Sequence, residues 1–342
     1  MKPRLIVLFL LSGFFLIVYN ANAQRGKYRV MFYNAENFFD TVDDTLIDDE
    51  EFLPEGDRHW NYRNFNIKLT NIFKVIAAVG GWEPPEVIGL CEVENEFVLN
   101  KLIYETPLLK YEYKMVHRES PDRRGIDAAI LYRKDKLKKL EEGFVPVSFS
   151  DNPDHKTREI VYMKALTMEG DTLYFFVNHW PSRFGGAETS EPFRMVAART
   201  LRKKVDSLFI SNKSARIIIM GDFNDEPANL SLTSGLEANF RYDSIMNDKL
   251  YNLTACIHSS NVPGTLKFQG EWSRFDQLIV SGALLSSGST ISTGCEHAFI
   301  FDNKFLLEYD DKYMGYKPFR SFSGYRYQRG YSDHLPVYLD LF

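Results

Sequence analysis

Five short polar segments in this chain each adjoin a hydrophobic, strand-like run. Gly221-Asp222-Phe223-Asn224 directly follows the β-branched run at 216–220 and places an acid and an amide on one side of a strand end. The other four are Tyr33-Asn34, Cys91-Glu92, Phe275-Asp276 and Ser332-Asp333-His334-Leu335-Pro336. Open α/β proteins bind and react at the carboxyl ends of strands, so these segments predict one shared site. Asp, Glu, Asn and His supply the oxygen ligands and proton-transfer groups of metal-assisted phosphoryl chemistry.

Hydrophobic periodicity predicts the elements that would position these segments. Helical spacing of apolar residues is expected at 64–79 and 191–209. Strands are expected at 27–33, 85–91, 127–132, 159–166, 173–177, 216–220, 277–280 and 337–341, with a hairpin turn at 169–171. Strands with few helices and a hairpin favour a mixed sheet system over a purely parallel, doubly wound sheet.

The first 23 residues are expected to form a secretory signal peptide. A positively charged start precedes an apolar run at 5–18, and Ala-Asn-Ala at 21–23 fits the small-residue cleavage pattern. The apolar run is shorter than the roughly 20 residues of a membrane span, although an uncleaved anchor is the alternative. Cleavage would leave 24–342 as a single catalytic domain, secreted or periplasmic, monomeric and without a stable membrane anchor.

Charge and cysteine content narrow the expectations further. The formal net charge is −5, so a nuclease of this sequence would need a local basic surface or metal ions at its site. Cys91 is expected to be a buried free thiol, whereas Cys256 and Cys295 either pair in an oxidising compartment or stay reduced. The acidic stretch at 40–60 lacks the spacing of an EF-hand, so a solvated loop is expected there rather than a Ca²⁺ site.

The ordered set of motifs resembles the endonuclease/exonuclease/phosphatase superfamily, whose fold is shared with pancreatic deoxyribonuclease I. The resemblance covers about Tyr28 to Phe342 and is strongest for secreted bacterial members. It implies an α/β, four-layered sandwich in which two mixed β-sheets pack face to face with helices outside. It also implies a phosphoric ester hydrolase that uses a divalent cation, with Mg²⁺ expected and Mn²⁺ or Ca²⁺ as alternatives. The motifs are Asn34, the strand-ending Glu92, Asn178-His179, Gly-Asp-Phe-Asn, Arg-Phe-Asp and Ser-Asp-His-Leu-Pro.

The resemblance assigns the metal ligands. Glu92 would be the principal ligand, helped by Asn34 and Asp333, and Glu36 or Asn37 could exchange roles with Asn34. The alternatives are a strand-end salt bridge for Glu92 and a turn-stabilising side chain for Asn34.

The resemblance also assigns the residues around the reacting phosphate. Asp222 matches the group that positions or deprotonates the attacking water, and Asn224 matches a group that binds the phosphate or the metal. An Asx-turn after the strand is the alternative for this pair. His334 would stabilise developing negative charge, with Asp276 orienting its ring, unless Asp276 forms a buried salt bridge with Arg274.

A second histidine completes the implied site. His179 is a candidate general acid, and its presence favours phosphodiester cleavage; Asp127 is its expected carboxylate partner. Asn178 and Arg158 are expected to bind substrate, with an ion pair to Glu159 as the alternative for Arg158.

The substrate is left open by the sequence. DNA or RNA is the first expectation, followed by a sphingomyelin-like phospholipid and then an inositol or sugar phosphate; a catalytically inactive binding protein on the same fold is the alternative of another class. Loops at 180–186 and 320–331 are expected near the substrate, the second because it interleaves basic and aromatic residues. Its alternative is a structural loop that packs its tyrosines.

Overall fold

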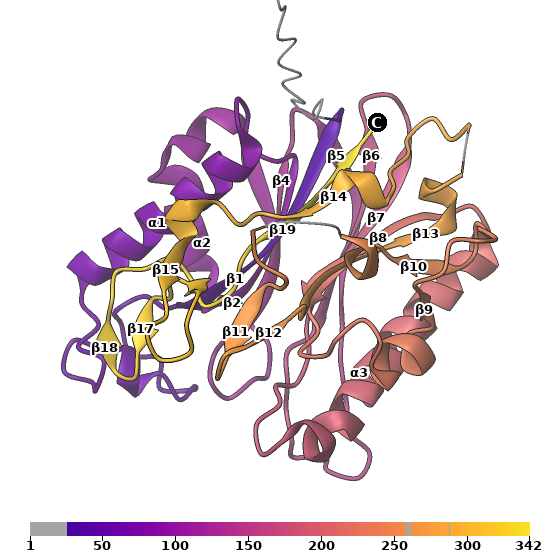
Figure 1. Ribbon diagram of the computed structural model, residues 1–342. Coiled ribbons are helices and arrows are strands. Elements are labelled where there is room, and N and C mark those ends of the chain that lie inside the picture. The colour runs from indigo at the N-terminus through magenta and orange to yellow at the C-terminus, as the bar shows by residue number, and fades with distance from the viewer. Residues whose placement is uncertain (1–25, 258–260, 287) are drawn as a thin grey trace, which may run out of the picture.

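Two β-sheets packed face to face dominate the computed structural model, which describes residues 26–257, 261–286 and 288–342 (Figure 1). The expected signal peptide lies outside the described residues. Within the described ranges, no helix combines the length and the apolar character that crossing a membrane requires.

Both sheets are mixed, as expected. Only the pairs β1–β2, β7–β8 and β9–β10 are parallel, and all other pairs within the two sheets are antiparallel. The first sheet has the order β14 (Ala298–Ile300), β19 (Val337–Leu341), β1 (Tyr28–Phe38), β2 (Val87–Val93), β4 (Asp127–Arg133) and β3 (Tyr113–Val116). The second has the order β5 (Leu137–Val145), β6 (Ile160–Thr167), β7 (Thr172–His179), β8 (Arg216–Asp222), β13 (Asp276–Ser281), β10 (Leu250–Asn252) and β9 (Ala238–Asn239).

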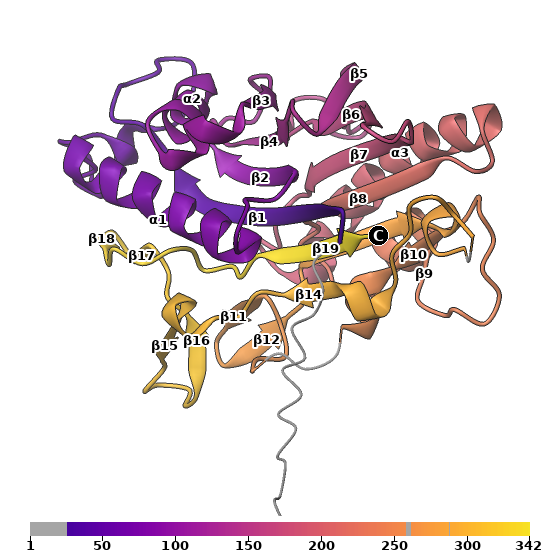
Figure 2. The same ribbon diagram turned by 90° about the horizontal axis from the view of Figure 1, so that it is seen from above.

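Among the residues that the structure describes, three α-helices form the outer layers of the sandwich. Helices α1 (Tyr62–Gly80) and α2 (Glu96–Tyr104) lie beside the first sheet, and α3 (Ala187–Ser211) lies beside the second (Figure 2). Asn61 caps the start of α1 by accepting a hydrogen bond from the Asn64 amide, and Gly81 ends it with a positive φ of 75°. The four-layered sandwich implied by the sequence is therefore confirmed.

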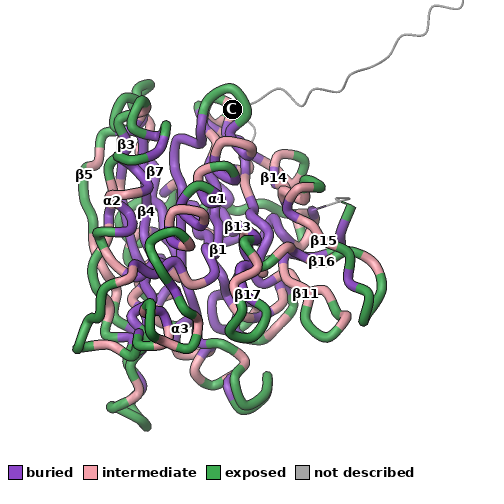
Figure 3. Tube along the Cα trace, turned by 90° about the vertical axis from the view of Figure 1, so that its left-hand side faces the viewer, coloured by how far each residue is buried: buried purple, intermediate pink, exposed green. Residues whose placement is uncertain are grey.

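Strand periodicity divides the apolar side chains between two cores. In β8, Ile218 and Met220 belong to the core that includes the space between the sheets, whereas Ile217 and Ile219 pack with α3. Figure 3 shows that the strands carry most of the buried chain and the connecting loops most of the exposed chain. Gly89 in β2 permits close packing of the sheets, because a Cβ at this position would lie 2.8 Å from Cγ2 of Val177.

Three two-stranded hairpins extend the chain beyond the sandwich. They are β11 (Leu266–Phe268) with β12 (Glu271–Ser273), β15 (Leu307–Tyr309) with β16 (Tyr316–Pro318), and β17 (Phe322–Ser323) with β18 (Arg326–Tyr327). The third lies within the basic and aromatic stretch at 320–331, where Tyr327 packs edge-on against Trp60 at 5.0 Å. The structural alternative therefore holds for this tyrosine, whereas Tyr325 is exposed.

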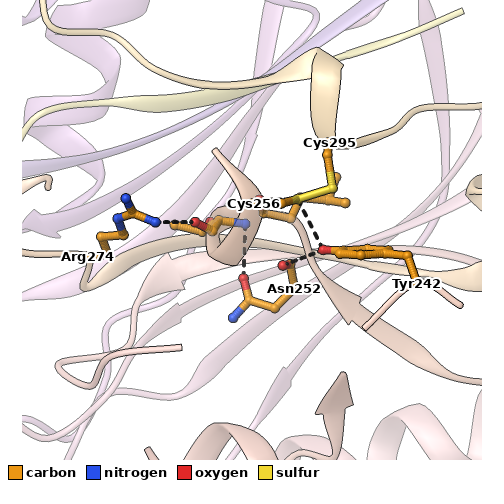
Figure 4. The surroundings of a disulfide bond; sticks show 7 residues. Tyr242, Asn252, Cys256, Arg274 and Cys295 are labelled. Carbon is orange, nitrogen blue, oxygen red and sulfur yellow. Dashed lines mark hydrogen bonds between the residues drawn. A yellow bond between two sulfur atoms is a disulfide. The ribbon is translucent and has the colours of Figure 1, made fainter. Parts of the chain in front are cut away.

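The cysteines settle one open alternative. Cys256 and Cys295 form a disulfide with a Cα–Cα distance of 5.8 Å (Figure 4), and Cys91 is a buried free thiol as expected. The hydroxyl of Tyr242 lies 3.2 Å from Sγ of Cys256 and donates to the carbonyl of Asn252, which ties the disulfide to the loop before it.

The acidic stretch at 40–60 departs from the expectation in one respect. Asp43, Asp44 and Asp48 are exposed, but Asp49 has only 1% of its surface exposed, so the prediction of a fully solvated loop was wrong there. One Asp49 oxygen accepts the Asp44 amide, which makes this acid part of the loop's own hydrogen bonding.

Candidate active site

The second sheet aligns three predicted site residues by its register. His179 at the end of β7 is paired with Asp222 at the end of β8, and Asp222 is paired with Asp276 at the start of β13. Side chains alternate along a strand, so Asp222 shares the face of Met220 and points toward the first sheet. The same alternation brings His179 to that face.

The first sheet supplies Asn34 and Glu92 from the opposite side. A bulge interrupts the pairing of β2 after Cys91, and Glu92 there has a φ of 56°, a conformation that is unusual for a residue with a side chain. Its Oε1 accepts from Nδ2 of Asn34 at 3.1 Å, and its Oε2 accepts from the amide of Asn37 at 3.0 Å. The bulge therefore aims the carboxylate at the site rather than along the strand.

One oxygen of Asp222 joins the two halves of the site. Its Oδ2 lies 3.2 Å from Nδ2 of Asn34 and 3.8 Å from Nε2 of both His179 and His334. Burial is the main cause that raises the pKa of Asp222 to about 6, and the charges of Asp276 and Glu92 add to it. The imidazole of His334 and the backbone amide of Asn224 act in the opposite direction. This carboxylate is poised to gain or lose a proton near neutral pH.

His334 is held by the carboxylate that the sequence predicted. Its Nδ1 lies 2.7 Å from Oδ2 of Asp276, and both residues are buried. Burial alone would lower the pKa of His334, but the charges of Asp276 and Asp222 outweigh it and raise the pKa well above its usual value. The alternative salt bridge with Arg274 is absent, because that guanidinium donates to the carbonyls of Pro263 and Thr254.

His179 has a different environment, and its expected carboxylate partner is not beside it. Nδ1 of His179 is buried without a hydrogen-bond partner among the described residues. Burial, together with the positive charges of Arg158 and Arg124, lowers the pKa of His179 well below its usual value. His179 therefore favours the neutral form, in contrast to His334.

The prediction that Asp127 orients His179 was wrong. Oδ2 of Asp127 lies 3.0 Å from Nε2 of His117, and Oδ1 accepts the Ser120 amide at 2.9 Å. The reason is position: Asp127 begins β4, whose other neighbour β3 leads directly into His117. His117 and Asp127 also come close to the exposed Glu119, so this acid belongs to a separate cluster.

The carbonyl of Trp180 connects Arg158 with Asn224. It accepts Nη2 of Arg158 at 2.9 Å and Nδ2 of Asn224 at 3.0 Å. Arg158 forms its ion pair with Asp122 at 2.7 Å rather than with Glu159. The backbone amide of Asn224 also donates to Oδ1 of Asp222. The Asx-turn that was the alternative for this pair is therefore formed, and Asp222 still faces the site through Oδ2.

Asn178 lies outside the site, and its predicted contact with substrate is not supported. The residue is fully buried, its Nδ2 donates to the carbonyl of Met220, and its Oδ1 accepts the indole of Trp180. Alternation along β7 places Asn178 and His179 on opposite faces of the sheet. The side chain therefore supports the end of the strand.

Asp333 lies at the edge of the site in a network of charged residues. Its Oδ2 lies 3.0 Å from Nη2 of Arg320, which also lies 3.4 Å from Oε1 of Glu36. Lys68 is fully buried and donates to the carbonyl of Tyr331 at 2.7 Å. Burial and the charge of Asp333 raise the pKa of Glu36 to about 7, although Lys68 and Arg320 oppose that shift.

Some of these neighbours could not be predicted from local sequence patterns. Lys68 sits within the helical pattern at 64–79, where a lysine is ordinarily solvated, and nothing local shows that it turns inward. Arg320 was visible only as part of a basic and aromatic stretch. Arg124 precedes the strand at 127–132 without any motif of its own.

The oxygen donors at the site fit a divalent cation. Glu92 offers a carboxylate whose side chain is 18% exposed, and Asp222 adds a carboxylate linked to it through Nδ2 of Asn34. The Oδ1 of Asn34 accepts the backbone amide of Glu36 at 2.9 Å. Asp222, Asp276 and His334 also place ligand atoms within 4.8 Å of one another. However, Asp276 is already paired with His334, so Asp222, Asp276 and His334 are better suited to sharing a proton than to binding a cation. Glu92 is the better centre of a cation site.

Comparisons with known proteins show the family and the fold of this chain. The sequence matches the endonuclease/exonuclease/phosphatase family over residues 29–342. A search of curated proteins gave no match. Three similar solved structures each align with 92% of this chain. They are humanized D. rerio TDP2 (15% identity, TM-score 0.57, 98% of that chain), Bacteroides thetaiotaomicron mannosyl-6-phosphatase Bt3783 (17%, 0.57, 99%) and the human nocturnin catalytic domain with a bound sulfate anion (17%, 0.52, 94%).

Proposed function

Because this chain belongs to the endonuclease/exonuclease/phosphatase family, a family of phosphoric ester hydrolases, we propose that it is a divalent-metal-dependent phosphodiesterase that cleaves DNA or RNA. The observation that carries the proposal is the convergence of Asn34, His179 and His334 on Oδ2 of Asp222. Two imidazoles and an amide around a carboxylate can hold a phosphodiester together with the water that attacks it.

Each of these groups has a role that follows from its surroundings. Asp222 accepts a proton from the attacking water and aligns it for in-line attack, which suits a carboxylate with a pKa of about 6. His334, kept protonated by Asp276, binds a phosphate oxygen and stabilises the negative charge that develops there. His179 contacts the phosphate from the other strand as a neutral imidazole.

Glu92 and Asn34 would hold the cation, with Asp333 as a further ligand at the edge of the site. Mg²⁺ is proposed first, with Mn²⁺ or Ca²⁺ as alternatives. When bound, the cation would neutralise charge on the phosphoryl oxygens and the leaving oxygen. No covalent intermediate with the protein is needed for this chemistry.

We also propose the compartment in which the protein acts. The disulfide between Cys256 and Cys295 favours an oxidising compartment, in line with a signal peptide at 1–23 and a secreted or periplasmic product. A mature chain that begins at Gln24 and acts as a monomer is the form that we propose to test.

The test compares substrates, metal and one histidine. The mature chain is incubated with single-stranded DNA, duplex DNA, RNA, sphingomyelin and a sugar phosphate, each with Mg²⁺ and with EDTA. His334→Ala is measured beside it, and His297→Ala serves as the control because His297 packs against Phe342 and contacts no site residue described above. Cleavage of a nucleic acid that requires both Mg²⁺ and His334 supports the proposal. Cleavage only of sphingomyelin or of the sugar phosphate rejects the nuclease assignment.

A further inference from the structure

A cavity of about 830 Å³ lies along the segment that follows His179, since Pro181, Ser182 and Phe184 line it. Arg124 and Arg158 line it, and both contribute positive charge that lowers the pKa of His179. Arg158 also donates to the carbonyl of Trp180, which accepts from Asn224 as well. Arg158 therefore connects the lining of the cavity with Asn224 and with the end of the strand that carries His179.

The lining of this cavity combines positive charge with aromatic rings. Arg123, Arg124 and Lys156 are exposed in it, whereas its buried acid, Asp122, is already paired with Arg158 at 2.7 Å. The only other acid in the lining is the exposed Asp154. The basic residues of the lining therefore outnumber its acids, which leaves an excess of positive charge. A chain with a net charge of −5 thus carries a local basic surface where a polyanion would need one.

The lining contains one exposed aromatic ring and one ring that is held by packing. Phe184 is 92% exposed and has little packing of its own to maintain. Phe193 stacks on the imidazole of His155 with a centroid distance of 4.7 Å, which fixes the orientation of both rings. An exposed ring near a fixed aromatic pair, beside cations, is the arrangement on which nucleic-acid bases stack.

We propose that this cavity binds the nucleotide next to the scissile phosphate. Its base stacks on Phe184 and on the His155–Phe193 pair, while its own phosphate contacts Arg124 and Lys156. The volume lies within the range of about 300–1,000 Å³ that is usual for small-ligand sites. A neutral sugar would leave the cations unused, and the excess positive charge of the lining would repel the quaternary ammonium of a choline headgroup. The inference rests on the proposed nuclease function and deepens it, because it assigns the residues that select a base-bearing strand.

The test separates the contribution of the bases from that of the phosphates. With Mg²⁺ present, kcat and KM are measured on a short single-stranded oligonucleotide, and an abasic strand of equal length is measured as a competitor with its own Ki. The variants are Phe184→Ala and Lys156→Gln, and Trp82→Ala is the matched control because Trp82 is 99% exposed and lies at the end of α1.

Phe184→Ala should raise KM about tenfold with kcat nearly unchanged, and should leave the Ki of the abasic strand as it is. Lys156→Gln should raise both KM and Ki and should reduce the salt dependence of binding by about one counterion. Trp82→Ala should change nothing. If the wild type cleaves the strand but Phe184→Ala leaves KM unchanged, or raises Ki for the abasic strand equally, the cavity assignment is overturned and the nuclease function stands. If the wild type cleaves no strand, both are overturned.

Discussion

Asp276→Asn is the substitution that tests the electrostatics of this site most directly. It keeps the size of the side chain but removes the charge that faces Nδ1 of His334 at 2.7 Å. The backbone register of Asp276 with Asp222 should be unaffected, since the pairing of β13 with β8 depends on main-chain hydrogen bonds. Any loss of activity can then be traced to the imidazole and its protonation.

The expected magnitude follows from the buried hydrogen bond. A hydrogen bond to a charged group contributes about 1.5–3 kcal/mol, which corresponds to roughly 10- to 150-fold in an equilibrium constant. Without the charge of Asp276, burial dominates and the pKa of His334 falls, so the imidazolium is depleted at neutral pH. Loss of a positioned proton donor or charge stabiliser costs about 10²- to 10⁴-fold in rate, and we expect kcat to fall by at least about 100-fold.

The assay is the pH dependence of kcat for hydrolysis of a small phosphodiester in Mg²⁺. In the wild type, activity should appear as pH rises through about 6, where Asp222 ionises, and should be lost only when pH rises through the raised pKa of His334. In Asp276→Asn the alkaline limb should move to lower pH, because the charge of Asp276 is the largest influence that raises the pKa of His334. Thermal unfolding establishes that the variant is folded, and Asp43→Asn at an exposed position is the control. A folded Asp276→Asn with wild-type kcat and an unmoved alkaline limb would refute this account.

Three other predictions test separate parts of the structure. Glu92→Gln should weaken Mg²⁺ binding at least tenfold by calorimetry, with activity partly restored at high Mg²⁺; unchanged affinity would remove Glu92 from the cation site. Cys256→Ser opens a loop with a sequence separation of 39 and should lower the free energy of unfolding by up to about 4 kcal/mol in urea titrations, whereas an unchanged midpoint would show that the disulfide adds no stability. Lys68→Met removes a buried charge that donates to the Tyr331 carbonyl and should cost about 3 kcal/mol or more by the same measurement; a neutral or stabilising result would mean that desolvation of Lys68 outweighs its contacts.

The parts of the fold that could be predicted are those with long hydrophobic patterns. The strand at 216–220 and the helix at 64–79 were placed within a few residues, because burial of one or both faces leaves a periodic signal. Strands of two or three residues, such as β9 and β17, have no period to read and were missed. Helix α2 was missed as well, since its nine residues give only two and a half turns of pattern.

The site shows the same division between local and distant information. Asn34, Glu92, Asp222 and His334 come together as the sequence predicted, but only Glu92 and Asp222 lie at strand ends, whereas Asn34 lies within β1 and His334 precedes β19. Partner choice was less predictable. Asp127 contacts His117, which directly follows β3, and does not contact His179. A sequence pattern does not say which of two histidines a carboxylate will reach.

The two histidines of the site are not equivalent, because their Nδ1 atoms have different hydrogen-bond partners. Both Nε2 atoms lie 3.8 Å from the same oxygen of Asp222, so distance alone would give them interchangeable roles. However, Nδ1 of His334 is anchored by Asp276, which fixes the ring and keeps Nε2 directed at the site, whereas Nδ1 of His179 is buried without a partner. An anchored imidazole can stabilise charge without reorganising, and an unanchored one is free to adopt the tautomer that the substrate requires. The arrangement therefore favours His334 as the fixed charge and His179 as the adaptable contact, on the side where the basic and aromatic cavity begins.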